Sequence, residues 1–196
     1  MDQPRTERSR RSRGERAGLT REQIVAAARR TLDARGLDGL SLRAVAAELG
    51  VAPNAIYSHL DDKNALIDAV LDDVLSTIAE PRTKDPRRAL KTIMVDTYDT
   101  LVEQARLVGA YLARQGSRGP EAQRLGMIMD RCLEQLGAGG AIGEAGRRSM
   151  IVYTIGYAAF ATGWTADGER PLPAAKVRRD FLAGLDWLIN GIAGPP

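Results

Sequence analysis

The stretch that decides the fold is SLRAVAAELGVAPNAIYSHL, residues 41–60. It contains two short segments with helical apolar spacing, separated by Gly50 and followed at once by Pro53. Ser41 is a favourable N-cap, glycine gives a tight turn its backbone freedom, and proline suits the first turn of a helix. Two short helices joined in this way form a helix-turn-helix unit. The stretch therefore predicts a second helix whose exposed side chains can enter a major groove of DNA.

Helices are also expected on both sides of this unit. Upstream, Thr20 and Gln23 have the spacing of a capping box, and an apolar face continues to Gly36, where the helix is expected to end. Downstream, an aspartate at position 61 or 62 is expected to cap a long fourth helix. Apolar residues at helical spacing continue to the C-terminus, and no segment shows the alternation of a strand. We therefore predict an all-α protein of about nine helices.

Composition narrows the setting in which the protein works. The chain has 196 residues and a single cysteine, Cys132, which excludes an internal disulfide and makes a cysteine-based zinc site very unfavourable. The start of the sequence lacks the pattern of a signal peptide. The longest apolar stretch, Met150–Trp164, is too short to cross a bilayer. We expect a cytoplasmic protein with no membrane partner.

Basic residues are concentrated in the first third of the chain. Residues 1–60 hold 11 lysines and arginines against 7 acidic residues, whereas residues 61–196 hold 17 against 18. Residues 1–17 include Arg8–Arg13, a run that has no apolar period and is expected to form a flexible basic arm. Such an arm either tracks DNA phosphates or only adds solubility. The asymmetry favours a polyanionic partner near the N-terminus.

The helix-turn-helix and its flanks resemble the TetR-type bacterial regulators. The resemblance is carried by Leu19–Ile24, Ala27, Ala28, Gly36, Leu40–Arg43, Val45, Ala46, Leu49–Val51, Ala55–Leu60, Lys63 and Leu66. Its most specific part is Tyr57 and His59 followed by Lys63 at the start of a long amphipathic helix. Beyond residue 80, only the length, the helix count and an apolar pair of C-terminal helices are similar to the family.

The resemblance implies a division of the chain and a function. Residues 18–63 would form the helix-turn-helix DNA-binding domain, with three helices, and residues 64–196 a helical ligand-binding and dimerisation domain. The protein would be a homodimeric repressor that a small-molecule effector releases from a pseudo-palindromic DNA operator. A ligand-independent regulator and an activator of the same fold remain alternatives. No cofactor and no metal are expected.

Candidate DNA-binding residues follow from chemistry and from this resemblance. Asn54 suits an adenine edge, and the apolar Pro53 and Ala55 suit thymine methyl groups. Arg43 matches a guanine-reading position of the family, and His59 and Lys63 match phosphate-binding positions. The full set comprises Ser41, Arg43, Pro53, Asn54, Ala55, Tyr57, Ser58, His59 and Lys63. Since several exposed positions are small, part of the specificity is expected to come from DNA shape.

The C-terminal half carries two further predictions. Its last two helices look too apolar for a small monomer, so they are expected to pair with their copies in a four-helix bundle. The interface would include Tyr153, Tyr157, Phe181, Leu185, Leu188 and Ile192. Soft and amphipathic side chains in the middle helices are candidates for a ligand pocket, with ordinary core packing as the alternative. They are Met94, Tyr98, Tyr111, Met127 and Met129.

An enzyme is not expected. The chain has one histidine and one cysteine, and its carboxylates and lysines form no recognisable catalytic constellation. Five glycines lie within residues 137–146, but no strand precedes them and no Lys-Ser/Thr pair follows, so they do not form a phosphate-binding loop. They are expected to form a flexible connection between helices. A helical lipid-binding or scaffold protein would leave the basic arm and Lys63 unexplained.

Overall fold

The computed structural model describes residues 18–114, 119–163 and 172–194. Within these ranges the chain forms nine α-helices and no strand, which confirms the all-α prediction. The helices are α1 Arg21–Gly39, α2 Leu42–Leu49, α3 Pro53–Tyr57, α4 Lys63–Leu75, α5 Pro86–Glu103, α6 Ala105–Ala113, α7 Pro120–Gln135, α8 Gly140–Ala161 and α9 Ala174–Ala193.

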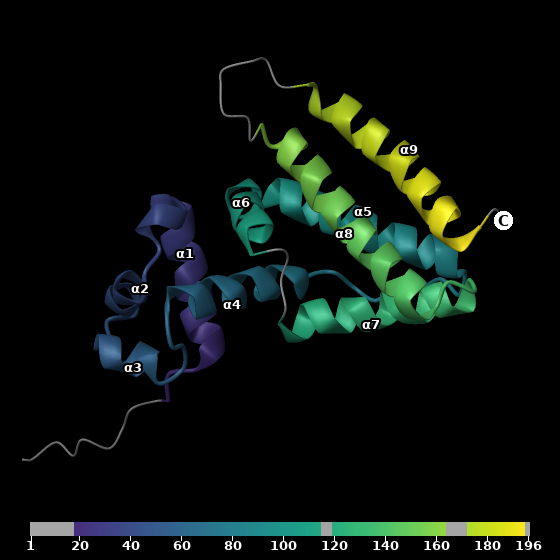
Figure 1. The fold of residues 1–196 in the computed structure, drawn as a ribbon. Helices are drawn as coiled ribbons and strands as arrows, with labels where there is room; N and C mark the ends of the chain where they lie inside the picture. Colours follow the sequence, from purple (N-terminus) through teal and green to yellow (C-terminus); the bar gives the residue numbers. More distant parts are fainter. Residues whose placement is uncertain (1–17, 115–118, 164–171, 195–196) are drawn as a thin grey trace, which may run out of the picture.

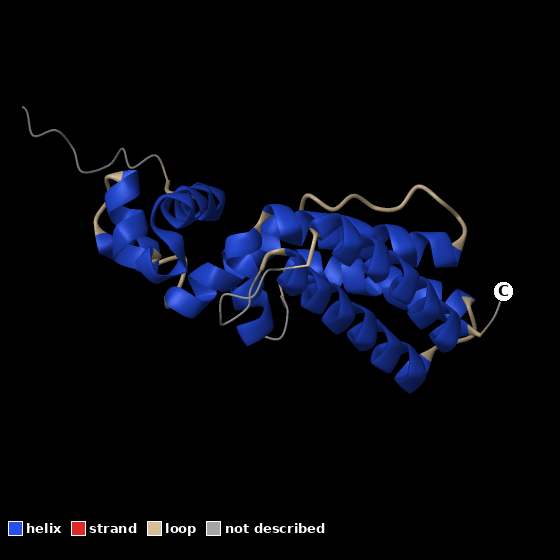
Figure 2. Cartoon of the chain, turned by 90° about the horizontal axis from the view of Figure 1, so that it is seen from above, coloured by secondary structure: helices blue, strands red, loops and turns tan. Residues whose placement is uncertain are grey.

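The helices form a small group and a large group joined by α4. Helices α1, α2 and α3 lie together at one end of the molecule, and α4 leads from them to α5–α9 (Figure 1). The view from above shows the small group projecting from the end of the larger bundle (Figure 2). We call α1–α3 the head and α5–α9 the body.

Local sequence signals set the helix ends in the head. Thr20 caps α1 in a complete capping box, in which Gln23 N donates to Thr20 Oγ1 and Thr20 N donates to Gln23 Oε1. Regular α1 geometry is broken at Gly36, which has a φ of 69°, and a short continuation reaches Gly39. Asp62 is the N-cap of α4, since its carboxylate accepts a 2.7 Å hydrogen bond from Ala65 N.

The glycine-rich segment after α7 is mostly helical, so the prediction of a flexible connection is wrong for most of its length. Helix α8 begins at Gly140. Gly146 is buried against α9, and a Cβ atom there would lie 2.8 Å from Cγ2 of Ile192. A side chain at this position would force Ile192 to move, because the two helices approach closely, and a single sequence does not reveal this packing demand.

An aromatic cluster joins α5, α8 and α9. The rings of Tyr98 and Phe181 stack with their centroids 4.4 Å apart, and Tyr153 and Tyr157 pack around them. The Tyr153 hydroxyl donates a 3.0 Å hydrogen bond to the Phe181 carbonyl. Since buried aromatic pairs stabilise beyond the area they cover, this cluster anchors α9 to the body.

This packing corrects the predicted dimer interface. Phe181 and Leu185 are fully buried within one chain and cannot contact a partner. Tyr153, Tyr157, Leu188 and Ile192 are half-buried and pack against the same core. The error has a physical reason: the most apolar stripe of each helix covers the chain's own α5, and a second stripe faces outward.

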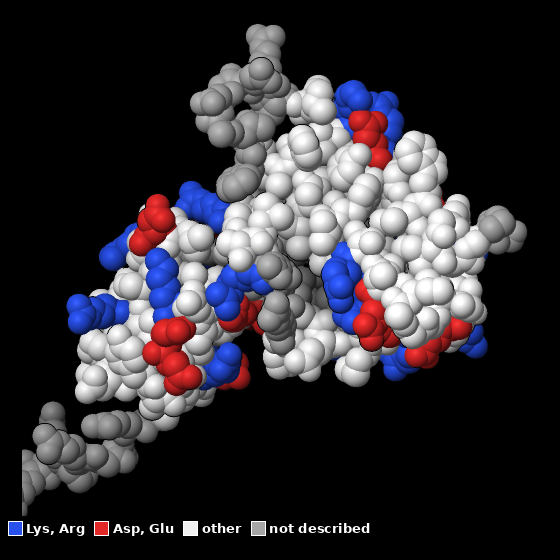
Figure 3. Space-filling model, in the orientation of Figure 1, with Lys and Arg blue, Asp and Glu red and all other residues white. Residues whose placement is uncertain are grey.

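The outward stripe of α8 and α9 is apolar and exposed. On α8 it contains Val152 and Phe160, with exposed fractions of 63% and 64%, and on α9 it contains Trp187, at 76%. Gly156 lies between the two α8 residues, with open space where a side chain would stand. Uncharged side chains cover most of the surface over α8 and the middle of α9 (Figure 3). We call these residues the outer stripe.

Polar contacts tie the head to α4 and to the body. Arg29 of α1 forms a 2.9 Å ion pair with Asp73 of α4. Arg106 of α6 donates to the main-chain carbonyls of Leu32 and Asp33 in α1. Helix α4 is therefore bonded to the head. Helix α6 also contacts the head directly.

Asp72 of α4 caps the N-terminus of α7. Its carboxylate accepts hydrogen bonds of 3.1 Å from both Glu121 N and Ala122 N, and a Cβ at Gly119 would overlap it. We expect Asp72→Ala to lower the free energy of unfolding by about 1 kcal/mol, since the α7 donors lose their acceptor. Chemical denaturation measures this change. Glu103→Ala, which removes an exposed acid from α5, is the control and should leave stability within about 0.5 kcal/mol.

Candidate nucleic-acid interface

The turn between α2 and α3 has the geometry of a helix-turn-helix. Gly50 adopts the left-handed conformation, with φ 65° and ψ 29°, and its N–H donates to Ala47 O. Val51 N then donates a 3.0 Å hydrogen bond to Ala46 O. Ala46 and Ile56 are buried beneath the turn. With its inner side fixed in this way, α3 presents its remaining side chains to solvent.

Most of the predicted contact residues lie on α3 and in the turn that follows it. Pro53, Asn54, Ser58 and His59 are exposed, and Ala55 is half-buried. Tyr57 is 49% exposed, an unusual position for a large aromatic ring in a free monomer. An amide, a phenol and an imidazole are therefore all exposed on α3 and the turn that follows it. The role of each residue in DNA recognition stays a prediction.

The hydroxyl and ammonium groups of the set already make contacts within the chain. Ser41 caps α2 by accepting from Ala44 N, which leaves its proton available for another acceptor. Ser58 donates to Ala55 O and can still accept. Lys63 donates one hydrogen bond of 3.2 Å to Leu37 O at the end of α1. An ammonium group has three donors, so Lys63 can position the head and also bind an anion.

Arg43 and His59 flank α3. Arg43 is exposed on α2. Glu22 lies in the first turn of α1: hydrogen bonds from the Glu22 N–H and from Thr20 lower its pKa, with smaller electrostatic contributions from Arg21 and His59. Basic and acidic residues are both present on the head in the view of Figure 3. The predicted basic arm, residues 1–17, lies outside the described ranges.

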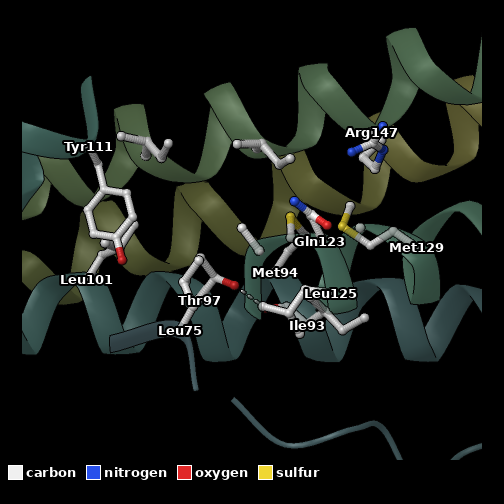
Figure 4. A pocket seen from close by; sticks show the side chains of 14 residues that line it. Leu75, Ile93, Met94, Thr97, Leu101, Tyr111, Gln123, Leu125, Met129 and Arg147 are labelled. Atoms are coloured by element: carbon white, nitrogen blue, oxygen red, sulfur yellow. Dashed lines mark hydrogen bonds between the residues drawn. The ribbon is translucent and has the colours of Figure 1, made fainter. Parts of the chain in front are cut away.

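A cavity of about 290 Å³ lies between α4 and the body and is lined by residues of α4–α8. Its lining residues are Leu75, Ile93, Met94, Thr97, Leu101, Tyr111, Ala122, Gln123, Leu125, Gly126, Met129, Arg147, Ile151 and Ile155. Figure 4 shows Arg147 and Met129 toward one end and Tyr111 at the other, with Gln123 between them. Concave, mostly apolar sites with a few polar groups are typical of small-molecule binding.

The cavity includes three of the five predicted pocket residues. Met94, Tyr111 and Met129 line it. Tyr98 stacks on Phe181 instead and is not among the lining residues. Met127 is 60% exposed on the outer face of α7, so its assignment to a pocket is wrong. Met127 and Met129 are two residues apart, and in a helix that spacing turns side chains to different faces.

Sequence reasoning missed the polar groups of the cavity. Arg147, Gln123 and Thr97 all line it. Two adjacent arginines after a glycine-rich segment are typical of solvated surface charge. No signal in a single sequence therefore distinguishes Arg147, which lines the cavity, from Arg148. Among the described ranges, no cluster of histidine, cysteine, aspartate or glutamate is suited to hold a metal ion. Those ranges also contain no helix with the length and hydropathy of a membrane span.

Tyr111 links the cavity to α4. Burial raises the pKa of Tyr111, with a smaller contribution from Asp72, so its hydroxyl stays protonated. It donates a hydrogen bond to the main-chain carbonyl of Leu71 in α4. A ligand in the cavity would therefore lie against a side chain that is bonded to the helix joining body and head.

Comparisons with known proteins agree with this geometry. The sequence profile described as "Bacterial regulatory proteins, tetR family" matches residues 24–70. The chain is 46% identical over 63 residues to the HTH-type transcriptional repressor DrrR1 of Streptomyces coeruleorubidus, a match that covers 32% of this chain and 23% of that protein. It is 27% identical over 183 residues to the HTH-type transcriptional regulator BetI of Burkholderia cenocepacia, covering 89% and 80%.

Solved structures extend the similarity to almost the whole chain. BioQ of Mycobacterium smegmatis superposes with a TM-score of 0.74 at 28% identity, covering 91% of this chain and 100% of that one. BioQ with its natural double-stranded DNA operator superposes with a TM-score of 0.69 at 28% identity, covering 89% of this chain and 98% of that one. A single-substitution variant of TetR from Acinetobacter baumannii in complex with minocycline gives 0.73 at 25%, covering 88% and 96%.

Proposed function

We propose that this chain is a DNA-binding transcriptional regulator of the TetR type, and that it acts as a homodimeric repressor which a small molecule releases from its operator. The observation that carries the proposal is the surface of α3 and the turn after it, where Asn54, Tyr57 and His59 are exposed above the buried Ala46 and Ile56. In this proposal the protein and its operator are both in the cytoplasm.

The DNA contacts proposed for the head divide into two kinds. Asn54 and Tyr57 on α3, with Arg43 on α2, are placed to meet base edges in the major groove. Ser41, Ser58, His59 and Lys63 would hold the phosphate backbone, which fixes the position of the head without reading sequence. The solved complex of BioQ with its operator supports this use of a similar fold.

The outer stripe supports the dimer. A chain of this size that leaves Trp187, Phe160 and Val152 exposed on adjacent helices carries an apolar surface typical of a protein interface. A two-fold axis through α8 and α9 of both chains would form a four-helix bundle and bury that surface. The same axis would set the two heads on successive half-sites of a pseudo-palindrome.

The cavity and α4 support control by an effector. The cavity touches α4 through Leu75 and through the Tyr111 hydrogen bond, and α4 is bonded to the head through Asp73. A ligand that shifts α4 would therefore change the separation of the two heads. To reverse occupancy from 1:99 to 99:1, the ligand must prefer the released form by about 10⁴-fold, or about 5.5 kcal/mol.

The test is footprinting on the DNA that flanks the protein's own gene. We expect a protected, pseudo-palindromic site whose affinity falls steeply with salt, since phosphate contacts displace counterions. Purified protein that ignores every duplex at low ionic strength would refute DNA binding. A footprint that no small molecule alters, or a promoter activated by the protein, would instead support the ligand-independent and activator alternatives.

A further inference from the structure

The polar groups of the cavity are not equivalent. The Thr97 hydroxyl donates a 2.7 Å hydrogen bond to the Ile93 carbonyl within α5, and the Tyr111 hydroxyl donates to the Leu71 carbonyl. Arg147 of α8 lies at one end of the cavity, and Gln123 of α7 also lines it (Figure 4). Of the described residues that line the cavity, Arg147 alone carries a charge. That end therefore determines the charge of a ligand.

Gly126 makes room for the Arg147 guanidinium. It is buried in the middle of α7 and lines the cavity. Its φ is not positive, so its backbone does not require glycine, and glycine is unfavourable in a helix interior relative to alanine. A Cβ atom there would lie 3.1 Å from Nη1 of Arg147. The missing side chain thus lets the guanidinium lie over α7 at the cavity wall.

Arg147 lies next to an acidic residue that does not line the cavity. Asp130 Oδ1 lies 2.8 Å from Arg147 Nε, close enough for an ion pair. The contact does not have hydrogen-bond geometry, and Nε is buried without a hydrogen-bond partner. Asp130 is not among the residues that line the cavity. The group that faces the cavity is therefore the cation.

We propose that the cavity binds a small amphipathic anion, namely a carboxylate attached to an apolar chain or ring. The carboxylate would lie on the Arg147 guanidinium, and the apolar part of the ligand would lie among Met94, Leu101 and Ile155. A cationic ligand would be repelled by Arg147, and a neutral apolar ligand would cover the guanidinium without offering it a partner, which is unfavourable. This proposal rests on the proposed function only in assigning the anion the role of effector.

The test uses the full-length protein and two matched probe pairs. They are octanoate with octanamide, and 4-phenylbutyrate with 4-phenylbutyramide, so that each pair differs mainly in charge. Calorimetric titration should give at least one carboxylate a higher affinity than its amide. Arg147→Gln should then lower the affinity for that carboxylate by about 10- to 100-fold, because a charged hydrogen bond is lost. The affinity for the amide should change little. Arg147→Lys should retain part of the preference.

Two controls separate charge at the cavity from general effects. Arg148→Gln removes the neighbouring, exposed arginine and should leave both affinities unchanged. Gly126→Ala should weaken the carboxylate through the 3.1 Å contact while α7 stays folded, which circular dichroism reports. The proposal is overturned if neither carboxylate binds better than its amide, or if Arg147→Gln binds the carboxylate as wild type does.

Footprints with the same preparations distinguish the two proposals. If the wild-type protein without probes binds no operator, the proposed function is refuted. The anion site is then judged by the calorimetric titrations alone. An operator footprint without any preference for carboxylates would refute only the anion site. A bound carboxylate that leaves the footprint unchanged would support the anion site and refute its role as effector.

Discussion

Replacing Trp187 with glutamate is expected to convert the dimer into a monomer and to lower operator affinity by about 10²- to 10⁴-fold, since two linked heads bind far more tightly than separate ones. Trp187 is 76% exposed in the single chain, so its loss does not disturb the core. In the proposed four-helix bundle, however, the new carboxylate would be buried without a partner, which is costly. Sedimentation and operator titration measure the two effects.

Met127→Glu is the matched control for this prediction. Met127 is also a large exposed apolar residue, at 60%, but it lies on α7 outside the outer stripe. The variant should remain dimeric and bind the operator as wild type does. If Trp187→Glu stays dimeric, or if both variants dissociate alike, the interface does not lie on the outer stripe.

Replacing Tyr57 with alanine is expected to weaken operator binding by about 10- to 100-fold, because a contact to base edges is worth about 1–3 kcal/mol. Tyr57 is half exposed on α3, so the head should keep its stability. Affinity for random duplex should change much less than affinity for the operator. Titration of both duplexes at one salt concentration measures this difference.

Lys63→Ala should give the opposite pattern. A lost phosphate contact weakens operator and random duplex alike and lowers the salt slope of binding by about one for each lysine removed. Part of its effect can come from the lost hydrogen bond to Leu37 O, so the melting temperature is measured alongside. If Tyr57→Ala binds the operator as wild type does, α3 is not the recognition helix.

Signals that act within a few residues were sufficient to predict the head. The capping box of Thr20 and Gln23, the left-handed Gly50 and the N-terminal Pro53 each work through the local backbone. Their geometry is the same in any protein that contains them. For this reason the helices of the head, and most of the residues exposed on α3 and just after it, followed from the sequence, whereas Ala55 is half-buried.

The body could not be predicted to the same depth, because its decisive contacts join distant segments. Helical periodicity identified apolar stripes on α8 and α9, but two stripes exist, and only the structure shows that Phe181 belongs to the inner one and Trp187 to the outer. Likewise, the value of Gly126 depends on Arg147, 21 positions later, whose guanidinium lies over it. Periodicity describes a helix face without naming its neighbour.

The bonding of α4 has a consequence for building hybrid regulators. A junction at residue 63, where the sequence divides most naturally, would separate Arg29 from its native partner Asp73 and would replace the α6 arginine that holds the carbonyls of Leu32 and Asp33. A transplanted head would then report a foreign effector poorly. A designer who wishes to exchange sensors should carry α4 and these two arginine contacts across as one module.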